Sequence, residues 1–339
     1  MMRPLLPVCL LALAACGHTE PFDYAPDGRG PFESTVPTRL TYDRGIDGQA
    51  AWGPDGTVVY VYDDPASRDE DTCIGVVPAE GGARVREVCE DPSLSTARAD
   101  KFYWPAMSPS GDIAYFHGIR IGSYEAGFNA ASLSWRRPDT PRQERPLSAM
   151  PFPAAPGGEM VISAVRDLAW LPDATVIFVG ATEDLVQPCP VCDAIIVEHG
   201  RGVWRADPAT QARAMLAGTE GAISATVTEG AVLFARRGDA RVWRFDLASG
   251  TTAPLLEPGG PGEAPVFLAA GGPLLAVTLG PGENVPQRIV LVDLRTGAVR
   301  ELPPEEAGIP YFRALPDPTG ERLLLETGSG DLYAMAAGG

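Results

Sequence analysis

Two cysteines separated by two residues, Cys189 and Cys192, form the pattern in this sequence that most directly suggests chemistry. Redox-active dithiols, zinc sites and local disulfides all use a Cys-x-x-Cys spacing. Haem attachment requires a histidine directly after the second cysteine, but Asp193 stands there. A zinc site needs two more ligands, and only His199 is close in the sequence. A structural disulfide is therefore the favoured interpretation, with a redox pair and half of a metal site as alternatives.

The other residues that could support catalysis are few and far apart. Histidine occurs at positions His18, His117 and His199, which leaves little for a metal cage or a Ser-His-Asp relay. The sequence contains no Gly-x-Ser-x-Gly elbow, phosphate-binding loop or His-Glu-x-x-His motif. The acidic stretch that begins at Asp63 and Asp64 has carboxylates for Ca²⁺ but lacks the spaced ligands of a calcium loop, so a solvated connection is favoured. We expect no catalytic residue, metal or cofactor.

The amino terminus has the pattern of an export signal. Arg3 precedes the apolar run from Leu5 to Leu13, which is too short to cross a hydrocarbon core of about 30 Å as a mature helix. The run leads into Leu-Ala-Ala-Cys ending at Cys16, and these four residues resemble the bacterial lipobox. The resemblance implies cleavage before Cys16, attachment of diacylglycerol to its sulfur, and N-acylation. Ordinary signal cleavage after Ala15 would instead leave this cysteine unmodified.

The residues around the predicted lipid anchor suggest a location. Gly17 rather than Asp follows the cysteine, and the resemblance to lipoprotein sorting in diderm bacteria implies the outer membrane if the organism has two membranes. Three acyl chains would bind the lipid bilayer permanently, because each buried methylene contributes about 0.8 kcal/mol. We therefore predict a signal peptide over 1–15, a lipidated N-terminus and flexible tether over 16–35, and a folded domain over 36–339.

Composition narrows the class of protein. The 339 residues are 45% hydrophobic, enough for a core, and they include 38 glycines and 34 prolines, which predict frequent turns and a chain rich in β-structure. Asp and Glu number 44 against 27 Lys and Arg, so the net charge is −17. Such a charge repels phosphate backbones, and nucleic acid is therefore not expected as a partner.

The predicted export signal also bears on the remaining cysteines. Without Cys9 and Cys16 the chain keeps an even number of cysteines, as exported disulfide-bonded proteins do. Cys73 and Cys89 are symmetric about Gly81, the turn of a predicted hairpin, so they should face each other across neighbouring strands. We predict a disulfide between them.

A repeated pattern organises the folded domain. A turn of the Pro-Asp-Gly type, or a weaker variant of it, lies between two short apolar runs six times, and a second hairpin follows in phase. Each unit therefore contains two successive hairpins and four strands. The turns of the six units lie at 53–56, 108–111, 171–173, 228–230, 270–272 and 316–320.

The strand count predicts a closed ring. The last unit has three strands of its own, and the unassigned strand-like segment 35–43 can pair with it as the fourth. The units resemble the TolB-type propeller repeat, in which an apolar strand, a Trp or small residue and Ser-Pro-Asp-Gly precede a second apolar strand. The resemblance implies an all-β fold, a β-propeller of six four-stranded blades whose last blade is closed by an N-terminal strand. A seventh blade would need a unit hidden between 118 and 133 or between 183 and 199.

Long insertions suggest where a partner binds. In a propeller, the loops between second and third strands and those between blades lie on one face, and the long insertions here belong to those two classes. The insertion after residue 118 offers Arg120, Tyr124 and Phe128, which are residue types that anchor interfaces. With Asp63 and Asp64 they form our candidate binding face. The alternative is that these loops only cover the channel mouth.

Two function classes follow from these observations. The favoured hypothesis is a non-enzymatic, lipid-anchored propeller that binds an envelope protein, peptide or glycan. The alternative is a propeller enzyme, of the lyase or metal-dependent lactonase or hydrolase type, with its active site at the channel mouth. An enzyme should present carboxylates and His at the channel, whereas the first strands offer Asp47, Arg166 and Asp167 without a His partner. Trp52, Trp104 and Trp170 recur in the first three units, and inter-blade packing is favoured over a ligand platform.

Overall fold

The structure is a computed structural model of the chain. It describes residues 30, 32–41, 47–63, 72–78, 85–89, 98–121, 131–136, 143–144, 161–186, 189, 195–210, 212–281, 288–303, 311–328 and 330–338. Every regular element among these residues is a β-strand, and none of them forms a helix long and apolar enough to cross a membrane.

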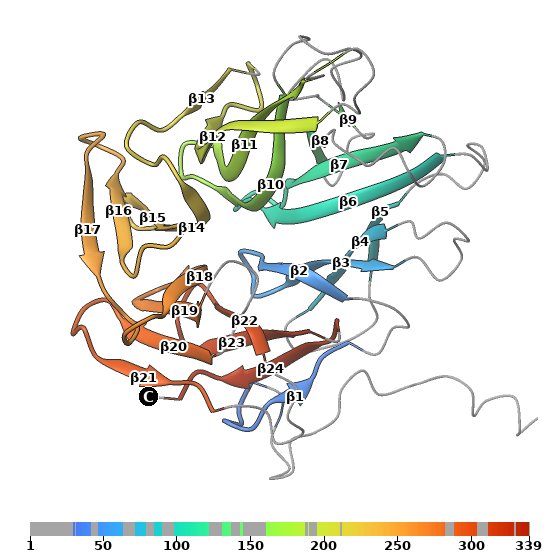
Figure 1. Ribbon diagram of the computed structural model, residues 1–339. Coiled ribbons are helices and arrows are strands. Elements are labelled where there is room, and N and C mark those ends of the chain that lie inside the picture. The colour runs from blue at the N-terminus through green and yellow to red at the C-terminus, as the bar shows by residue number, and fades with distance from the viewer. Residues whose placement is uncertain are drawn as a thin grey trace, which may run out of the picture.

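The strands form six four-stranded antiparallel sheets, which are the blades of a β-propeller (Figure 1). Blade 1 consists of β2 (Asp47–Trp52), β3 (Val58–Asp63), β4 (Thr72–Val77) and β5 (Val85–Val88). Blade 2 consists of β6 (Arg98–Met107), β7 (Ile113–Ile121), β8 (Ala131–Arg136) and β9 (Gln143–Glu144). Blade 3 consists of β10 (Val161–Trp170), β11 (Val176–Val186), β12 (Ile195–Ala206) and β13 (Arg213–Met215). The predicted fold class is confirmed.

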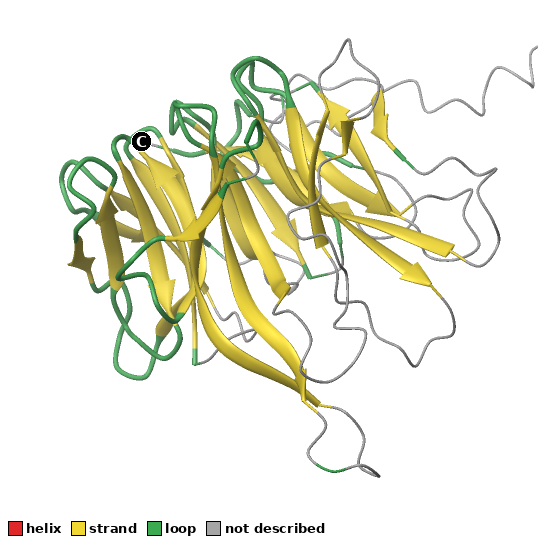
Figure 2. Ribbon diagram, turned by 90° about the horizontal axis from the view of Figure 1, so that it is seen from above, coloured by secondary structure: helices red, strands yellow, loops and turns green. Residues whose placement is uncertain are grey.

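Blades 4 to 6 complete the ring. Blade 4 consists of β14 (Ala222–Thr228), β15 (Ala231–Arg236), β16 (Val242–Asp246) and β17 (Thr252–Leu256). Blade 5 consists of β18 (Ala264–Gly271), β19 (Leu274–Gly280), β20 (Arg288–Asp293) and β21 (Val299–Glu301). Blade 6 consists of β22 (Tyr311–Pro316), β23 (Arg322–Thr327), β24 (Leu332–Ala336) and β1 (Thr38–Arg39). The first strand of each blade lies nearest the centre of the ring in Figure 1. Figure 2 shows the long β11–β12 hairpin extending beyond the body of the ring.

The N-terminal strand closes the ring as the sequence predicts. β1 pairs antiparallel with β24, with Thr38 opposite Ala334. Two backbone hydrogen bonds extend the contact, because Leu40 N donates to Leu332 O at 2.7 Å and Ala336 N donates to Ser34 O at 2.7 Å. The last blade therefore takes its fourth strand from the opposite end of the chain.

Apolar side chains fill the spaces between blades. The described residues form six buried clusters, and each cluster joins one pair of neighbouring blades, including the pair formed by blades 6 and 1. The second strand of a blade is buried on both faces because it lies between two neighbours, and β19 is buried along its whole length. Its sequence, LLAVTLG, has the near-continuous apolar character expected of such a strand.

Each first strand carries a register shift that redirects side chains toward the axis. All six first strands show such a shift against their second strands. In blades 1 to 3 the shift includes a non-glycine residue with positive φ, namely Gln49 at 50°, Trp104 at 49° and Asp167 at 55°. A bulge places an extra residue in one strand and changes the direction of its side chain. Three polar or aromatic side chains are thereby set at matching depths in the channel.

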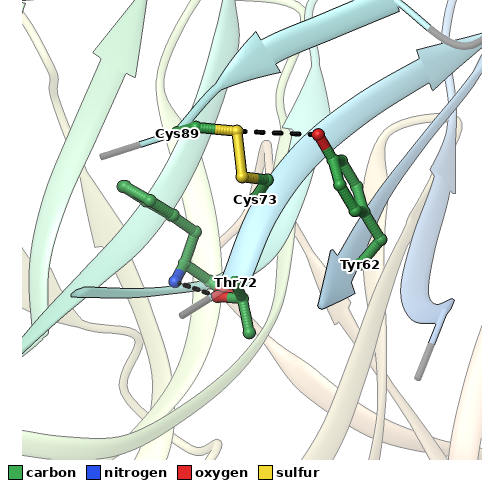
Figure 3. Close-up of a disulfide and its surroundings, with 5 residues drawn as sticks. Tyr62, Thr72, Cys73 and Cys89 are labelled. Atoms are coloured by element: carbon green, nitrogen blue, oxygen red, sulfur yellow. Dashed lines mark hydrogen bonds between the residues drawn. A yellow bond between two sulfur atoms is a disulfide. The ribbon is translucent and has the colours of Figure 1, made fainter. Parts of the chain in front are cut away.

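The hairpin disulfide predicted in blade 1 is present. Cys73 in β4 and Cys89, directly after β5, are bonded, with a sequence separation of 16 (Figure 3). The Tyr62 hydroxyl lies 3.6 Å from Cys89 Sγ. Cys189 is also disulfide-bonded, and Cys192 lies outside the described residues, so their pairing stays a prediction.

Candidate functional site

A cavity of about 680 Å³ lies on the axis of the propeller. All six first strands contribute to its wall, and it continues to the turns that follow them, including Gly53, Pro109 and Pro172. These turns join first strands to second strands. The cavity therefore opens on the face opposite to the end of β3 at Asp63, where the predicted binding face begins.

Four side chains from opposing blades meet next to this cavity: Trp104 and Arg313 belong to its wall, and Arg166 and Phe267 contact these two residues. Trp104 of blade 2 and Phe267 of blade 5 approach from opposite sides, as do Arg166 of blade 3 and Arg313 of blade 6. The Arg166 guanidinium carbon lies 4.2 Å from the Phe267 ring centre and 5.5 Å from that of Trp104. The Arg313 carbon lies 4.8 Å from the Trp104 ring centre and 5.9 Å from that of Phe267. We call these four residues the axial cluster; cation–π attraction holds it together.

Two buried carboxylates accompany the arginines. Arg313 Nη1 lies 3.2 Å from Glu326 Oε2, and Glu326 is only 1% exposed. Arg166 Nε lies 3.4 Å from Asp167 Oδ2, too far for a strong charge-assisted hydrogen bond. Each arginine therefore has an acidic neighbour, but the two pairs differ in geometry.

Both carboxylates also accept hydrogen bonds from the first strand of the next blade. Ala50 N donates to Glu326 Oε1 at 2.6 Å, which joins blade 6 to blade 1. Ser224 Oγ and Ala225 N donate to Asp167 Oδ2 at 2.6 and 3.1 Å, which joins blade 3 to blade 4. First strands are sheet edges, and their inward N–H groups need acceptors that the sheet itself does not supply.

Uncharged side chains join other pairs of neighbouring blades by the same kind of hydrogen bond. Gln49 Oε1 accepts from Trp104 N at 2.8 Å, and Ser224 Oγ accepts from Leu268 N at 3.0 Å. Thr226 Oγ1 accepts from Ala270 N at 3.0 Å. Buried polar residues near the channel thus have a structural task, which makes them weaker candidates for catalysis than their burial alone suggests.

The three recurring tryptophans have two different roles. Trp52 and Trp170 end β2 and β10, and their indole N–H groups donate to the preceding blade, at Leu315 O (2.8 Å) and Ala106 O (3.0 Å). This is the inter-blade packing that the sequence favours. Trp104 instead belongs to the axial cluster. In blade 2 the position that matches Trp52 and Trp170, directly before the turn, is occupied by Met107. The distance of a tryptophan from the turn therefore distinguishes the packing role from the axial one.

The candidate binding face falls largely outside the described residues. Asp64, Tyr124 and Phe128 are not described, and only the backbone of Arg120 is placed, in β7. Asp63 ends β3 and pairs with Thr72. This face stays a prediction, and the site that the structure does define is the axial cavity. Sequence reasoning named Trp52, Trp104, Trp170 and Asp167 of its wall, and Arg166 beside it.

Metal-binding groups do not gather in the described part of the chain. No group of three or more His, Cys, Asp or Glu residues there could hold a metal ion. His117 is buried and stacks on Phe102, with ring centres 4.9 Å apart. Tyr103, next to Trp104, has a pKa raised to about 12 because burial disfavours the phenolate. Asp47 is buried at the start of β2.

Comparison with known proteins identifies the fold. No protein-family model matches the chain, and no curated protein matches its sequence. TolB from Acinetobacter baumannii matches in structure with a TM-score of 0.50 and 17% identity, over 83% of this chain and 63% of that one. The chain thus spans less than two thirds of the TolB chain.

Two further structures match over nearly their whole length. A gluconolactonase from Xanthomonas campestris has a TM-score of 0.56 and 15% identity, over 93% of this chain and 94% of that one. A chain of a mitotic checkpoint complex has a TM-score of 0.50 and 12% identity, over 93% and 98%. Similarity at these identities concerns the fold and not the chemistry. The chain therefore has a TolB-like fold, a six-bladed β-propeller.

Proposed function

We propose that this chain is a non-enzymatic binding module of a bacterial cell envelope, held on the outer membrane by acylated Cys16, that takes a segment of a peptide or protein partner into its axial cavity. The observation that carries the proposal is the cavity itself, whose volume of about 680 Å³ lies within the range of about 300–1,000 Å³ typical of ligand sites.

The lining of the cavity suits a partly apolar ligand. Tryptophan rings and proline rings surround it, with few charged groups among them. Aromatic and proline side chains lose little conformational entropy when they bind, which favours them as binding surfaces. Structures that share the fold include TolB and a chain of the mitotic checkpoint complex, and the second of these is a protein assembly. These features support a peptide or protein partner.

The segment that follows the predicted tether contacts the propeller at a residue of the cavity wall. Phe32 packs against Trp52 with ring centres 5.4 Å apart and ring planes tilted by 53°, and Trp52 is a residue of the cavity wall. The chain therefore enters the propeller near the cavity mouth. Between Cys16 and Gly30 an extended chain reaches at most about 46 Å, at roughly 3.3 Å per residue. An acylated Cys16 would keep this part of the propeller within about 46 Å of the membrane, close to partners at its surface.

Site-specific photo-crosslinking tests the binding function. A crosslinking amino acid replaces Glu229, an exposed residue at the rim of the cavity, in the full chain produced in its host. The matched control replaces Val299, which is 52% exposed on the outer strand β21. We expect adducts with a peptide or protein at position 229 and none at 299.

Other results would contradict the proposal. Equal adducts at both positions, or none at either, would show that the cavity does not bind an envelope partner. A stoichiometric divalent ion in the purified protein would favour the metal-dependent enzyme instead. Adducts that carry sugar would show that the partner is a glycan rather than a peptide or protein.

The anchor has its own test. Cys16→Ser removes the sulfur that carries diacylglycerol, so labelling with a fatty-acid analogue should be lost and the protein should leave the membrane fraction. A Cys9→Ser variant is the control, because Cys9 lies in the predicted signal peptide. Membrane retention of the Cys16 variant at the level of the unmodified chain would overturn the anchor.

A further inference from the structure

We propose that the axial cluster is a receptor for an organic carboxylate that carries a hydrogen-bond donor beside its carboxyl group, with Arg313 and Arg166 as the cationic receptor groups and Asp167 as the acceptor. This inference rests on the proposed binding function and specifies the ligand of the same cavity. The donors and acceptors left without hydrogen bonds in the cavity wall, at Arg313 and Asp167, and beside it, at Arg166, carry the inference.

The two arginines keep donors that the protein does not use. Arg313 lines the cavity and is 5% exposed, yet its Nε makes no hydrogen bond. Arg166 is 9% exposed, and neither its Nε nor its Nη2 makes a hydrogen bond. Buried polar groups normally have partners, because desolvation without a hydrogen bond costs free energy. Two such guanidinium groups in one cluster indicate a site built for an anion.

The neighbouring carboxylates do not use up these donors. Glu326 accepts from Arg313 Nη1 and from Ala50 N, and Asp167 Oδ2 accepts from Ser224 and Ala225. Both acids thus take neutral donors from the first strands as well. The guanidinium carbons lie 4.2 Å from the Phe267 ring centre for Arg166 and 4.8 Å from the Trp104 ring centre for Arg313. A guanidinium carries its N–H donors in a planar fork, which matches the geometry of a carboxylate.

A monoanion fits the site better than a phosphate. The two guanidinium groups of the axial cluster already lie beside two carboxylates, Asp167 and Glu326, and the whole chain has a net charge of −17. A doubly charged phosphate would therefore meet more repulsion than a carboxylate with a single charge. The site accordingly favours a carboxylate.

Asp167 defines the second feature of the ligand. Its Oδ1 is buried without a hydrogen-bond partner, and the residue lines the cavity beside Arg166. A ligand that places a donor next to its carboxylate can satisfy this oxygen and the arginine donors together. The backbone N–H at a peptide C-terminus and the hydroxyl of a 2-hydroxy acid both have this arrangement, so the two sources share one chemistry.

Calorimetric titration of the purified full chain with three probes tests the proposal. N-acetyl-alanyl-phenylalanine presents a peptide C-terminus, and phenyllactate is a free 2-hydroxy acid. The C-terminal amide of the peptide removes the charge and replaces one acceptor oxygen by an NH2 donor. We expect the acid to bind at least about tenfold more tightly than the amide, since hydrogen bonds to charged groups contribute roughly that factor. Binding of the peptide acid alone identifies a peptide C-terminus as the source, and equal binding of phenyllactate identifies a free acid.

Variants separate a receptor from a structural cluster. Arg166→Gln removes a guanidinium with no hydrogen bond, and the double variant Arg313→Gln with Glu326→Gln removes a buried ion pair without leaving one charge alone. Both should weaken binding of the acid at least about tenfold. Arg236→Gln is the matched control, because the Arg236 guanidinium carbon lies 4.0 Å from the Trp243 ring centre and Arg236 belongs neither to the cavity wall nor to the axial cluster.

Specific results would overturn the inference. These are equal affinity of the acid and its amide, failure of both acids to bind, or unchanged binding in the Arg166 variant and in the folded double variant. Crosslinks at position 229 in the chain with its arginines intact would then show that a partner still binds the cavity although the carboxylate proposal fails. Absence of crosslinks in that same chain would instead reject the binding function itself.

Discussion

At the scale of single residues, burial alone does not separate structural polar groups from functional ones. Glu326, Asp167 and Ser224 are buried around the channel, and each accepts a backbone N–H from the first strand of the next blade. A β-strand at a sheet edge leaves such donors unpaired, and a side-chain oxygen from the neighbour satisfies them. The arginines of the axial cluster have no comparable structural partner for all their donors. The distinction lies in the hydrogen bonds.

The buried pair of Arg313 and Glu326 leads to a stability prediction. Arg313→Met leaves Glu326, which is 1% exposed, without its cation, so the free energy of unfolding should fall by about 3–5 kcal/mol. Adding Glu326→Gln removes the stranded charge and keeps an acceptor for Ala50 N, and most of the loss should be recovered. Urea unfolding of the two variants measures the difference. Equal stability of the single and double variants would show that the unpaired Glu326 charge does not cause the loss.

At the scale of elements, each blade is stabilised by pairing within its sheet and by contacts specific to that blade. Blade 1 has the Cys73–Cys89 disulfide across its outer hairpin. Blade 5 has Arg288 on β20 between two acids, Glu263 before β18 and Glu301 on β21. Four strands alone are a small sheet with two exposed edges, so such contacts keep the outer strands in register.

The disulfide should contribute measurably to stability. A bridge that closes a loop of 16 residues is expected to contribute about 3 kcal/mol through the entropy of the unfolded chain. The double variant Cys73→Ala with Cys89→Ala should therefore unfold at lower urea concentration than the oxidised protein. A reductant should lower the stability of the unmodified chain toward that of the variant. Non-reducing peptide mapping that finds both thiols free would contradict the bridge.

The ion pair of blade 5 predicts a specific response to acid. Hydrogen bonds from Arg288, followed by that from Gly260 N, lower the pKa of Glu263 from its usual 4.5 to about 2. Because the pKa is lower in the folded state, this stabilisation is present above pH 4.5 and is lost as the pH falls toward 2. NMR titration should find Glu263 ionised at pH 3.5, and Arg288→Gln should return its pKa toward 4.5. An unchanged pKa in that variant would contradict the assignment.

At the scale of the whole molecule, stability depends on closing a ring. The six apolar clusters each need two blades, so opening one interface exposes apolar side chains on both sides of the gap. The N-terminal segment belongs to this closure, because β1 pairs with β24 and Leu40 lies in the cluster between blades 6 and 1. Phe32 adds a contact to Trp52 in the same cluster.

Two truncations test this closure. Deletion of residues 17–41 removes β1, Phe32 and Leu40, so the melting temperature should fall sharply or the protein should become insoluble. Deletion of residues 17–29 keeps all of these contacts and should leave the melting temperature nearly unchanged. Circular dichroism during heating measures both. Equal melting temperatures would show that the N-terminal strand does not stabilise the ring.

The sequence by itself determined the architecture of this protein. Turns such as Pro54-Asp55-Gly56 and the alternation of short apolar strands are local signals, because turn chemistry and the two-residue period of a strand depend on neighbouring residues. Counting strands then required a fourth strand for the last blade, and the symmetry of Cys73 and Cys89 about a turn placed them on facing strands. Each of these inferences needed only short-range spacing or a count.

The tertiary structure alone decided which residues meet on the axis. Arg166 and Arg313 lie on opposite blades, and nothing in their spacing shows that both stack on Trp104 and Phe267. Their meeting depends on closure of the ring and on bulges such as the one at Trp104, whose positive φ turns the side chain inward. These are long-range properties of the packed blades. A site assembled from several blades therefore becomes visible only when the whole ring is in place.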